Sequence, residues 1–262
     1  MTLMNVEALI NNGIPEELAR SNYDFFKELH GIIIKEQYAD AQAMLNNCKA
    51  IEKDKVILVR KAFSALFLIN RSREWTSHGV WRTFRFWTQE EKVSYLKRAN
   101  ILVESLKQVT PLVTYGFGSV LGFVRDKDFI PHDDDMDLLV AIPTEMVRSY
   151  NQAKNLLIAH LSDNGINCYN ENRTHFTANG VDVFIGFIEQ DKSISWFPSR
   201  RRPGMTLSDI FPSKQIEILG VKVDIPNNAE YYLELTYGAN WSMPDSAWLH
   251  PWAISEFAEY LE

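Results

Sequence analysis

Residues 131–143 read Pro-His-Asp-Asp-Asp-Met-Asp-Leu-Leu-Val-Ala-Ile-Pro, a carboxylate cluster that runs directly into an apolar segment. The apolar residues 138–142 have the length and composition of a buried β-strand. In a regular strand Asp135 and Asp137 lie on one face, about 6 to 7 Å apart, because alternate side chains point the same way. The segment therefore predicts two carboxylates side by side at the start of a strand.

The aspartates of this cluster need either open water or a cation, because they would repel one another in a dry environment. Magnesium and manganese prefer carboxylate oxygens, and the adjoining buried strand makes a cation the better explanation. We therefore predict Mg²⁺ or Mn²⁺ held by Asp135 and Asp137. Asp133 shares their parity and is a further candidate for the site. Asp134 should point away if the strand is regular this far.

A glycine-rich turn precedes the cluster. Residues 116–125 read Gly-Phe-Gly-Ser-Val-Leu-Gly-Phe-Val-Arg. Glycines let backbone N–H groups approach an anion, and a helix that begins near Ser119 would favour a phosphate at its N-terminus. We predict that Gly118 and Ser119 bind phosphate. Taken alone, the turn fits an ordinary strand-to-helix connection as well.

A second buried strand is predicted at residues 181–188, which read Val-Asp-Val-Phe-Ile-Gly-Phe-Ile. Asp182 lies within this apolar run, where an aspartate is costly unless it is paired or bound to a metal. It is therefore a candidate third carboxylate of the site. The alternative is an aspartate at a strand entrance that bonds to the turn at Asn179-Gly180, since Asn-Gly is a strong hairpin signal.

These motifs together resemble the nucleotidyltransferase superfamily, and more narrowly the LicD family, which is related to fukutin and fukutin-related protein. The resemblance is carried by residues 118–125, by Phe-Ile-Pro-His-Asp-Asp-Asp-Met-Asp-Leu at 129–138, and by a later block. That block contains Ile-Glu-Ile-Leu-Gly-Val-Lys-Val-Asp-Ile-Pro at 216–226 and Glu-Tyr-Tyr-Leu-Glu-Leu-Thr-Tyr-Gly at 230–238. It is similar to the family's closing hairpin and helix. The resemblance extends over about residues 98–245.

The resemblance implies an α+β fold with a nucleotidyltransferase-like mixed sheet flanked by helices. It also implies a reaction, in which a hydroxyl of an acceptor glycan attacks the β-phosphorus of a CDP-linked donor and CMP is released. The transferred group would be phosphocholine or an alditol phosphate. Asp135 and Asp137 would hold the metal, and Asp182 would be a third ligand or the base that accepts the hydroxyl proton.

Cationic side chains near these segments are candidates for binding the donor. Arg125 matches an arginine of the family, and the alternative is a simple ion pair with Asp133 or Asp134. His132 stands where the family usually shows tryptophan, so the chain departs from the family pattern at this position. A histidine there could donate to phosphate or could be a surface histidine beside carboxylates.

Arg173 and His175 are further candidates for substrate binding. His175 would reach the site of Asp182 if residues 173–178 pair with the strand at 181–188 as a hairpin. The run Ser-Arg-Arg-Arg-Pro-Gly at 199–204 reads as a solvated loop or as a clamp for donor or acceptor.

The composition of the chain argues against several other classes of protein. The chain has 262 residues, 46% of them hydrophobic, and a formal net charge of −7, which argues against a nucleic-acid partner. The two cysteines have no Cys-x-x-Cys spacing, so neither a zinc ribbon nor a disulfide framework is indicated. The start of the chain does not read as a signal peptide, and the apolar residues 56–69 are too short to span a bilayer. We expect a cytoplasmic protein, with peripheral contact at the inner face of the membrane left open.

The first 97 residues predict a helical subdomain, followed by the catalytic domain at 98–245 and a helical tail at 246–262. Helix starts are indicated by Pro15 with the acids that follow it and by the capping box Thr88-Gln-Glu-Glu91. Between them, residues 75–87 interleave aromatic residues with arginines. This stretch fits helices that pack onto the sheet, with a glycan- or membrane-binding surface as the alternative.

Two other functions remain open on this sequence. A nucleotidyltransferase would attack the α-phosphorus of a nucleoside triphosphate and release pyrophosphate with the same metal chemistry. A catalytically silent module would keep the fold alone. The product separates the first two, since CMP marks the LicD-type reaction and pyrophosphate marks nucleotidyl transfer.

Overall fold

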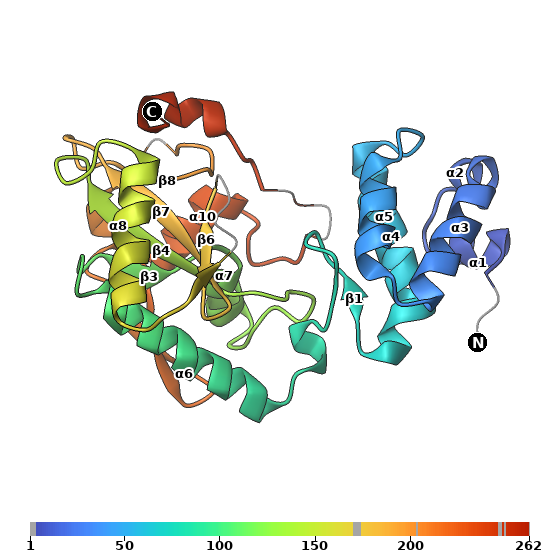
Figure 1. Ribbon diagram of the computed structural model, residues 1–262, viewed down its shortest axis with the longest axis horizontal. Coiled ribbons are helices and arrows are strands. Elements are labelled where there is room, and N and C mark those ends of the chain that lie inside the picture. Colours follow the sequence, from blue (N-terminus) through green and yellow to red (C-terminus); the bar gives the residue numbers. More distant parts are fainter. Residues whose placement is uncertain (1–3, 170–173, 203, 246–247, 249, 262) are drawn as a thin grey trace. The chain divides into compact units, whose positions relative to one another are not determined.

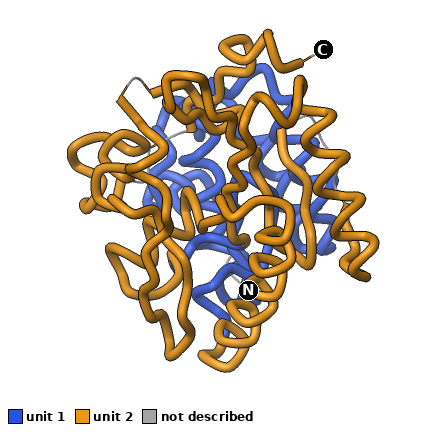
Figure 2. Tube along the Cα trace, turned by 90° about the vertical axis from the view of Figure 1, so that its left-hand side faces the viewer, with its two compact units in different colours: residues 1–87, 131–134 blue, residues 88–130, 135–262 orange. Residues whose placement is uncertain are grey.

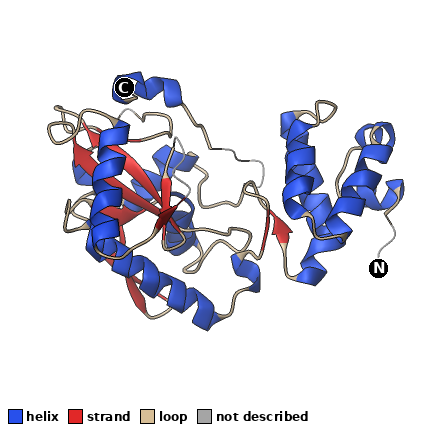
Figure 3. Ribbon diagram, in the orientation of Figure 1, coloured by secondary structure: helices blue, strands red, loops and turns tan. Residues whose placement is uncertain are grey.

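The computed structural model describes residues 4–169, 174–202, 204–245, 248 and 250–261. It is a mixed α and β structure, 47% helical and 18% strand, with a mixed sheet flanked by helices (Figures 1 and 3). The α+β class predicted from the sequence is confirmed. The chain divides into two compact units: residues 1–87 with 131–134, and residues 88–130 with 135–262 (Figure 2).

The N-terminal unit is mainly helical, as expected. Asn5 caps its first helix by accepting a hydrogen bond from the Ala8 N–H, and Pro15 precedes the second helix. Its core is apolar and includes Phe26, Leu29 and Phe63. Its helices are α1 (Val6–Asn11), α2 (Glu16–Ser21), α3 (Tyr23–Ile34), α4 (Tyr38–Asn47), α5 (Lys53–Phe63), η1 (Ser64–Leu68), η2 (Ile69–Arg71) and η3 (Phe84–Phe86).

The aromatic and arginine-rich stretch forms a short hairpin, β1 (Glu74–Trp75) with β2 (Val80–Trp81), where we expected helix. Gly79 has a φ of +133°, a backbone conformation that glycine adopts readily, and this closes the turn. The Trp75 side chain is 5% exposed, and the Arg85 Nε lies 3.3 Å from a carboxylate oxygen of Glu74. Trp75 and Arg85 therefore behave as expected for an aromatic residue packed in the core and an arginine paired with an acid. Trp81 does not, because it is 50% exposed.

The second unit is built on a six-stranded sheet in the order β3-β4-β7-β6-β5, with β8 also paired to β7. β4 and β7 run parallel, and the other neighbouring pairs are antiparallel. A separate hairpin, β9 with β10, precedes the last α-helix, as the sequence predicted. The strands are β3 (Val113–Tyr115), β4 (Asp137–Pro143), β5 (Cys168–Tyr169), β6 (Phe176–Ala178), β7 (Val181–Ile188), β8 (Ile194–Trp196), β9 (Lys214–Ile218) and β10 (Val221–Ile225).

Helices of the second unit pack as α6 with α8 and as α7 with α10. The Thr88 hydroxyl caps α6, and the Glu91 carboxylate accepts the Thr88 N–H, which confirms the capping box. α7 lies close to the sheet, because a Cβ atom at Gly116 would come within 2.3 Å of the Leu139 side chain on β4. The helices are α6 (Gln89–Leu106), α7 (Phe117–Arg125), α8 (Tyr150–Asp163), α9 (Leu207–Ile210), α10 (Ala229–Tyr237) and η4 (Ile254–Tyr260).

The boundary between the units falls between Trp87 and Thr88, ahead of the expected boundary at residue 97, because α6 packs entirely with the second unit. The N-terminal unit also includes residues 131–134. Within it, the Phe84 N–H donates to the Asp133 carbonyl at 2.9 Å and the Arg85 N–H to the Pro131 carbonyl at 2.7 Å. In the part of the chain that is described, no helix combines the length and apolar character needed to cross a bilayer.

Candidate functional site

Asp137 and Asp182 stand opposite each other on the neighbouring parallel strands β4 and β7. Residues paired in register share a face of the sheet, so the two carboxylates project on the same side. The Asp182 N–H donates to the Met136 carbonyl at 2.8 Å, which extends the pairing one residue ahead of β4. The sheet thus brings together two carboxylates that are distant in the sequence.

The hairpin between β6 and β7 supplies two partners for Asp182. Asn179 and Gly180 have φ values of +52° and +80°, as a two-residue hairpin turn of this type requires. The turn places Thr177 in register with Asp182, and the Thr177 hydroxyl donates to Asp182 Oδ1 at 2.6 Å. His175 Nε2 lies 3.2 Å from Asp182 Oδ2. Residues 176–178 pair with β7 as the sequence predicted, and His175 lies beside Asp182 as expected; residue 173 of the predicted hairpin lies outside the described residues.

The N-terminus of α7 lies beside the start of β4. Ser119 is 6% exposed, and its hydroxyl accepts a hydrogen bond from the Asp137 N–H at 2.9 Å. Phe117, the first helical residue, has a φ of +37°, and its N–H donates to the Tyr232 hydroxyl at 2.9 Å. A positive φ is costly for a bulky residue, so the turn is strained to bring α7 here. Ser119 holds the backbone of Asp137, while Gly118 is partly exposed and phosphate binding by both residues stays a prediction.

Tyr95 on α6 was not identified from the sequence. Its hydroxyl donates to the Gly180 carbonyl, at the turn that leads into β7. Burial is the main cause that raises the pKa of Tyr95 well above its ordinary value, and nearby carboxylates add to it. Those carboxylates are Asp135, Asp182 and Asp137. A buried tyrosine on the apolar side of a helix has no sequence signal that separates it from a core residue.

Asp135 precedes β4, which begins at Asp137 and not at Asp135 as we expected. Residues 131–134 belong to the N-terminal unit, so regular β4 structure does not extend back over the cluster. Within that unit Asp134 Oδ1 lies 3.3 Å from His78 Nδ1, and the Asp134 N–H donates to Asp133 Oδ1 at 3.1 Å. His132 is exposed.

The predicted arginines are placed differently from expectation. Arg125 makes a two-pronged pair with Asp126, at 2.9 Å and 2.8 Å, and not with Asp133 or Asp134. Its guanidinium is at the last turn of α7, at the opposite end of the helix from Gly118. Arg173 lies outside the described residues.

The arginine run at 199–204 is engaged within the protein. The Arg202 Nε donates to the Leu235 carbonyl at 2.6 Å, near the C-terminal end of α10, and burial lowers the pKa of Arg202. Arg201 pairs with Glu259 and stacks its guanidinium over the Phe257 ring at 5.0 Å. These contacts favour a structural role over a substrate clamp.

Asp137 and Asp182 offer the oxygen donors that a hard divalent cation prefers. Their two negative charges lie on one face of the sheet, and a cation bound there would offset their repulsion. Among the described residues, however, no group of three or more His, Cys, Asp or Glu side chains has the mutual placement of a metal site. Both Asp182 oxygens have partners in His175 and Thr177. The metal therefore stays a prediction, with Asp137 and Asp182 as its best-placed ligands.

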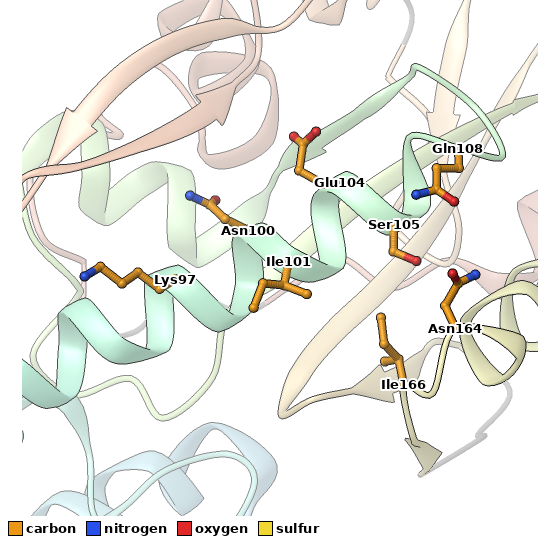
Figure 4. Close-up of a pocket in the computed structure, with 8 residues that line it drawn as sticks. All are labelled: Lys97, Asn100, Ile101, Glu104, Ser105, Gln108, Asn164 and Ile166. Carbon is orange, nitrogen blue, oxygen red and sulfur yellow. The ribbon is translucent and has the colours of Figure 1, made fainter.

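A hollow of about 510 Å³ lies along α6 (Figure 4). Asn164 and Ile166, which follow α8, line its other side. The site aspartates are not among its lining residues, so it is not the candidate site. The residues that line it are Lys97, Asn100, Ile101, Glu104, Ser105, Gln108, Asn164 and Ile166.

Comparison with known proteins identifies a family for part of the chain. Residues 113–228 match the family model described as LicD/FKTN/FKRP, nucleotidyltransferase domain. A search of curated proteins found no significant match. The matched residues run from β3 through β10 and include the paired strands β4 and β7 with Asp137 and Asp182. Proteins with this domain are of the transferase type. Residues 113–228 therefore match the nucleotidyltransferase domain of the LicD family, as the sequence motifs predicted.

Proposed function

We propose that this protein transfers a substituted phosphate, such as phosphocholine or an alditol phosphate, from a CDP-linked donor to a hydroxyl of a glycan. The observation that carries the proposal is the register of Asp137 and Asp182 on adjacent parallel strands beside the N-terminus of α7. Carboxylates on one sheet face, next to backbone N–H groups at a helix start, suit a metal-bound diphosphate.

In the proposed reaction the acceptor hydroxyl oxygen forms a bond to the β-phosphorus of the donor. The bond between that phosphorus and the oxygen that bridges to the α-phosphorus breaks, and CMP leaves with the bridging oxygen. If Asp182 is the base, it accepts the hydroxyl proton, and the Thr177 hydroxyl and His175 hold its carboxylate in place. A bound Mg²⁺ or Mn²⁺ would neutralise charge on the donor phosphates.

Asp137 is assigned to metal binding, with Asp135 as a second ligand. Ser119 fixes the start of β4 through the Asp137 N–H, so the carboxylate is oriented by a buried contact. Asp182 would serve as base or as a third ligand, as the sequence indicated. His175 would hold Asp182 in place and contact the substrate.

The test is release of CMP by the purified 262-residue chain from CDP-choline, CDP-ribitol and CDP-glycerol, with glycan acceptors, with and without Mg²⁺. The proposal expects CMP from at least one donor, only with metal, and none from Asp137→Ala. Release of pyrophosphate from a nucleoside triphosphate, without CMP from any donor, would establish nucleotidyl transfer instead. No turnover of any of these substrates would favour a silent module.

A further inference from the structure

Four aromatic rings are packed together on the side of the sheet that carries the carboxylates. The rings of Phe184 and Trp252 are nearly parallel, with planes 12° apart and centroids 6.1 Å apart. His250 and Trp252 are also parallel, at 12° and 4.5 Å. Phe117 meets Phe184 edge-on at 5.0 Å and meets His250 edge-on at 5.3 Å. Phe184, Trp252 and His250 therefore form a stack of nearly parallel rings, and the Phe117 ring packs against its edge.

The stack begins where the carboxylates end. Phe184 follows Asp182 by two residues in β7, so the two side chains share a face about 7 Å apart along the strand. His175 joins them, because its Nε2 lies 3.2 Å from Asp182 Oδ2 and its ring centroid lies 4.9 Å from that of Phe184. A ligand that reaches the carboxylates is therefore close to the aromatic stack.

Trp252 is the exposed member of the stack. The residue is 48% exposed, against 5% for Phe184 and 1% for Phe117. Its backbone is held in place on both sides: the Arg200 N–H donates to the Pro251 carbonyl at 2.9 Å, and the Ala253 N–H donates to the Pro198 carbonyl at 2.9 Å. The tryptophan is thus an exposed ring on an ordered backbone, supported by buried rings.

We propose that Trp252 is a stacking surface for the nucleobase of the donor nucleotide. The inference rests on the proposed function, because it gives a binding surface for the cytosine base of the proposed CDP-linked donor. A nearly parallel stack extends naturally by one more flat ring, whereas a quaternary ammonium group needs aromatic faces arranged around it. Each stacked base contributes about 1–3 kcal/mol in known single-strand sites, and stacking tolerates different bases.

The experiment measures CMP binding to the full chain by calorimetry in the presence of Mg²⁺. Trp252→Ala should weaken CMP binding about 5- to 150-fold, which is that stacking energy converted at 1.4 kcal/mol per tenfold. Trp252→Phe keeps a flat ring and should retain most of the affinity. Ribose 5-phosphate, which lacks the base, should bind wild type and Trp252→Ala equally. Trp81→Ala is the matched control, since Trp81 is 50% exposed in the N-terminal unit.

The outcomes separate the inference from the proposed function. Equal CMP affinity for wild type and Trp252→Ala, or an equal loss for CMP and ribose 5-phosphate, overturns the stacking role while transfer from a CDP-linked donor stands. Loss of acceptor-glycan binding alone would also overturn it and place a sugar on Trp252. If AMP or UMP binds through Trp252 and CMP does not bind, stacking holds and the CDP donor is wrong. No nucleotide binding by wild type overturns both.

Discussion

The two units of this protein use their charged groups differently. In the N-terminal unit charged side chains lie in pairs of opposite charge around an apolar core, as Arg20 does with Glu16 and Arg85 with Glu74. In the second unit two carboxylates stand side by side on central strands, and the buried hydroxyl of Tyr95 lies near them. Charges set together inside ordered structure cost stability, and proteins retain them mainly where function requires them. The comparison therefore favours the second unit as the place of the proposed transfer reaction.

The largest effect should come from neutralising a carboxylate of the sheet. Asp137→Asn should lower CMP release about 100- to 1000-fold, because a group that stabilises charge at the reacting phosphate is lost. The melting temperature should stay the same or rise, since repulsion with Asp182 is relieved. A coupled assay for CMP and a thermal melt measure the two quantities.

The matched control is Asp134→Asn, in the same sequence cluster but paired with His78 in the N-terminal unit. Its activity should be close to that of wild type. If both variants lose activity equally, the division of the cluster between the two units has no functional meaning.

Two glycines, one in each unit, allow the packing of the units to be compared. Gly116→Ala should destabilise the second unit by about 1–3 kcal/mol, because the new Cβ would meet the Leu139 side chain at 2.3 Å in an already packed interior. Gly31→Ala on α3 meets nothing within 4 Å and should stabilise the N-terminal unit by up to about 1 kcal/mol. Urea denaturation of both variants checks the signs, and a Gly116→Ala variant as stable as wild type would contradict the close approach of α7.

Much of this arrangement could be predicted from the sequence. The strands at β4 and β7 follow from continuous apolar runs, and the turn at Asn179-Gly180 follows from the conformations those residues tolerate. An aspartate inside an apolar strand predicts that the carboxylate has partners, and Asp182 has two, while its part in catalysis stays a prediction. These predictions depend on local patterns alone.

The remainder depends on contacts between distant segments. Whether β4 and β7 are neighbours, and in what register, is not encoded in either strand. The same holds for Tyr95, whose hydroxyl meets a carbonyl far along the chain, and for Trp252, whose stacking partner is Phe184. Arg125 shows that a local motif can also mislead. The motif predicted that Arg125 binds the donor, whereas in the structure its guanidinium pairs with the adjacent Asp126. Side-chain partners are decided by tertiary structure, which short motifs do not report.

Removing the Tyr95 hydroxyl tests whether the residues packed around the carboxylates affect metal binding and activity. Tyr95→Phe should lower activity and Mn²⁺ affinity about 10- to 100-fold, because its hydroxyl holds the Gly180 carbonyl in the turn two residues before Asp182, a candidate metal ligand. Tyr115→Phe is the matched control, because the Tyr115 hydroxyl is also buried and donates to Asn100 Oδ1 at 3.0 Å. Both variants should lose similar stability in a thermal melt. Equal loss of Mn²⁺ affinity in the two would mean that Tyr95 is only a core residue.

The smallest effect is a pH dependence confined to the N-terminal unit. Burial, and then the charge of Arg71, lower the pKa of His30, whose ring packs 4.4 Å from that of Phe67. The folded state therefore favours the neutral ring, and the unfolded state binds more protons between the lowered pKa and the ordinary value of about 6.5. This stability is fully present above about pH 6.5 and is lost as the pH falls through the folded pKa. His30→Gln should flatten that decline in urea titrations between about pH 7 and 5, and an unchanged slope would place the acid sensitivity elsewhere.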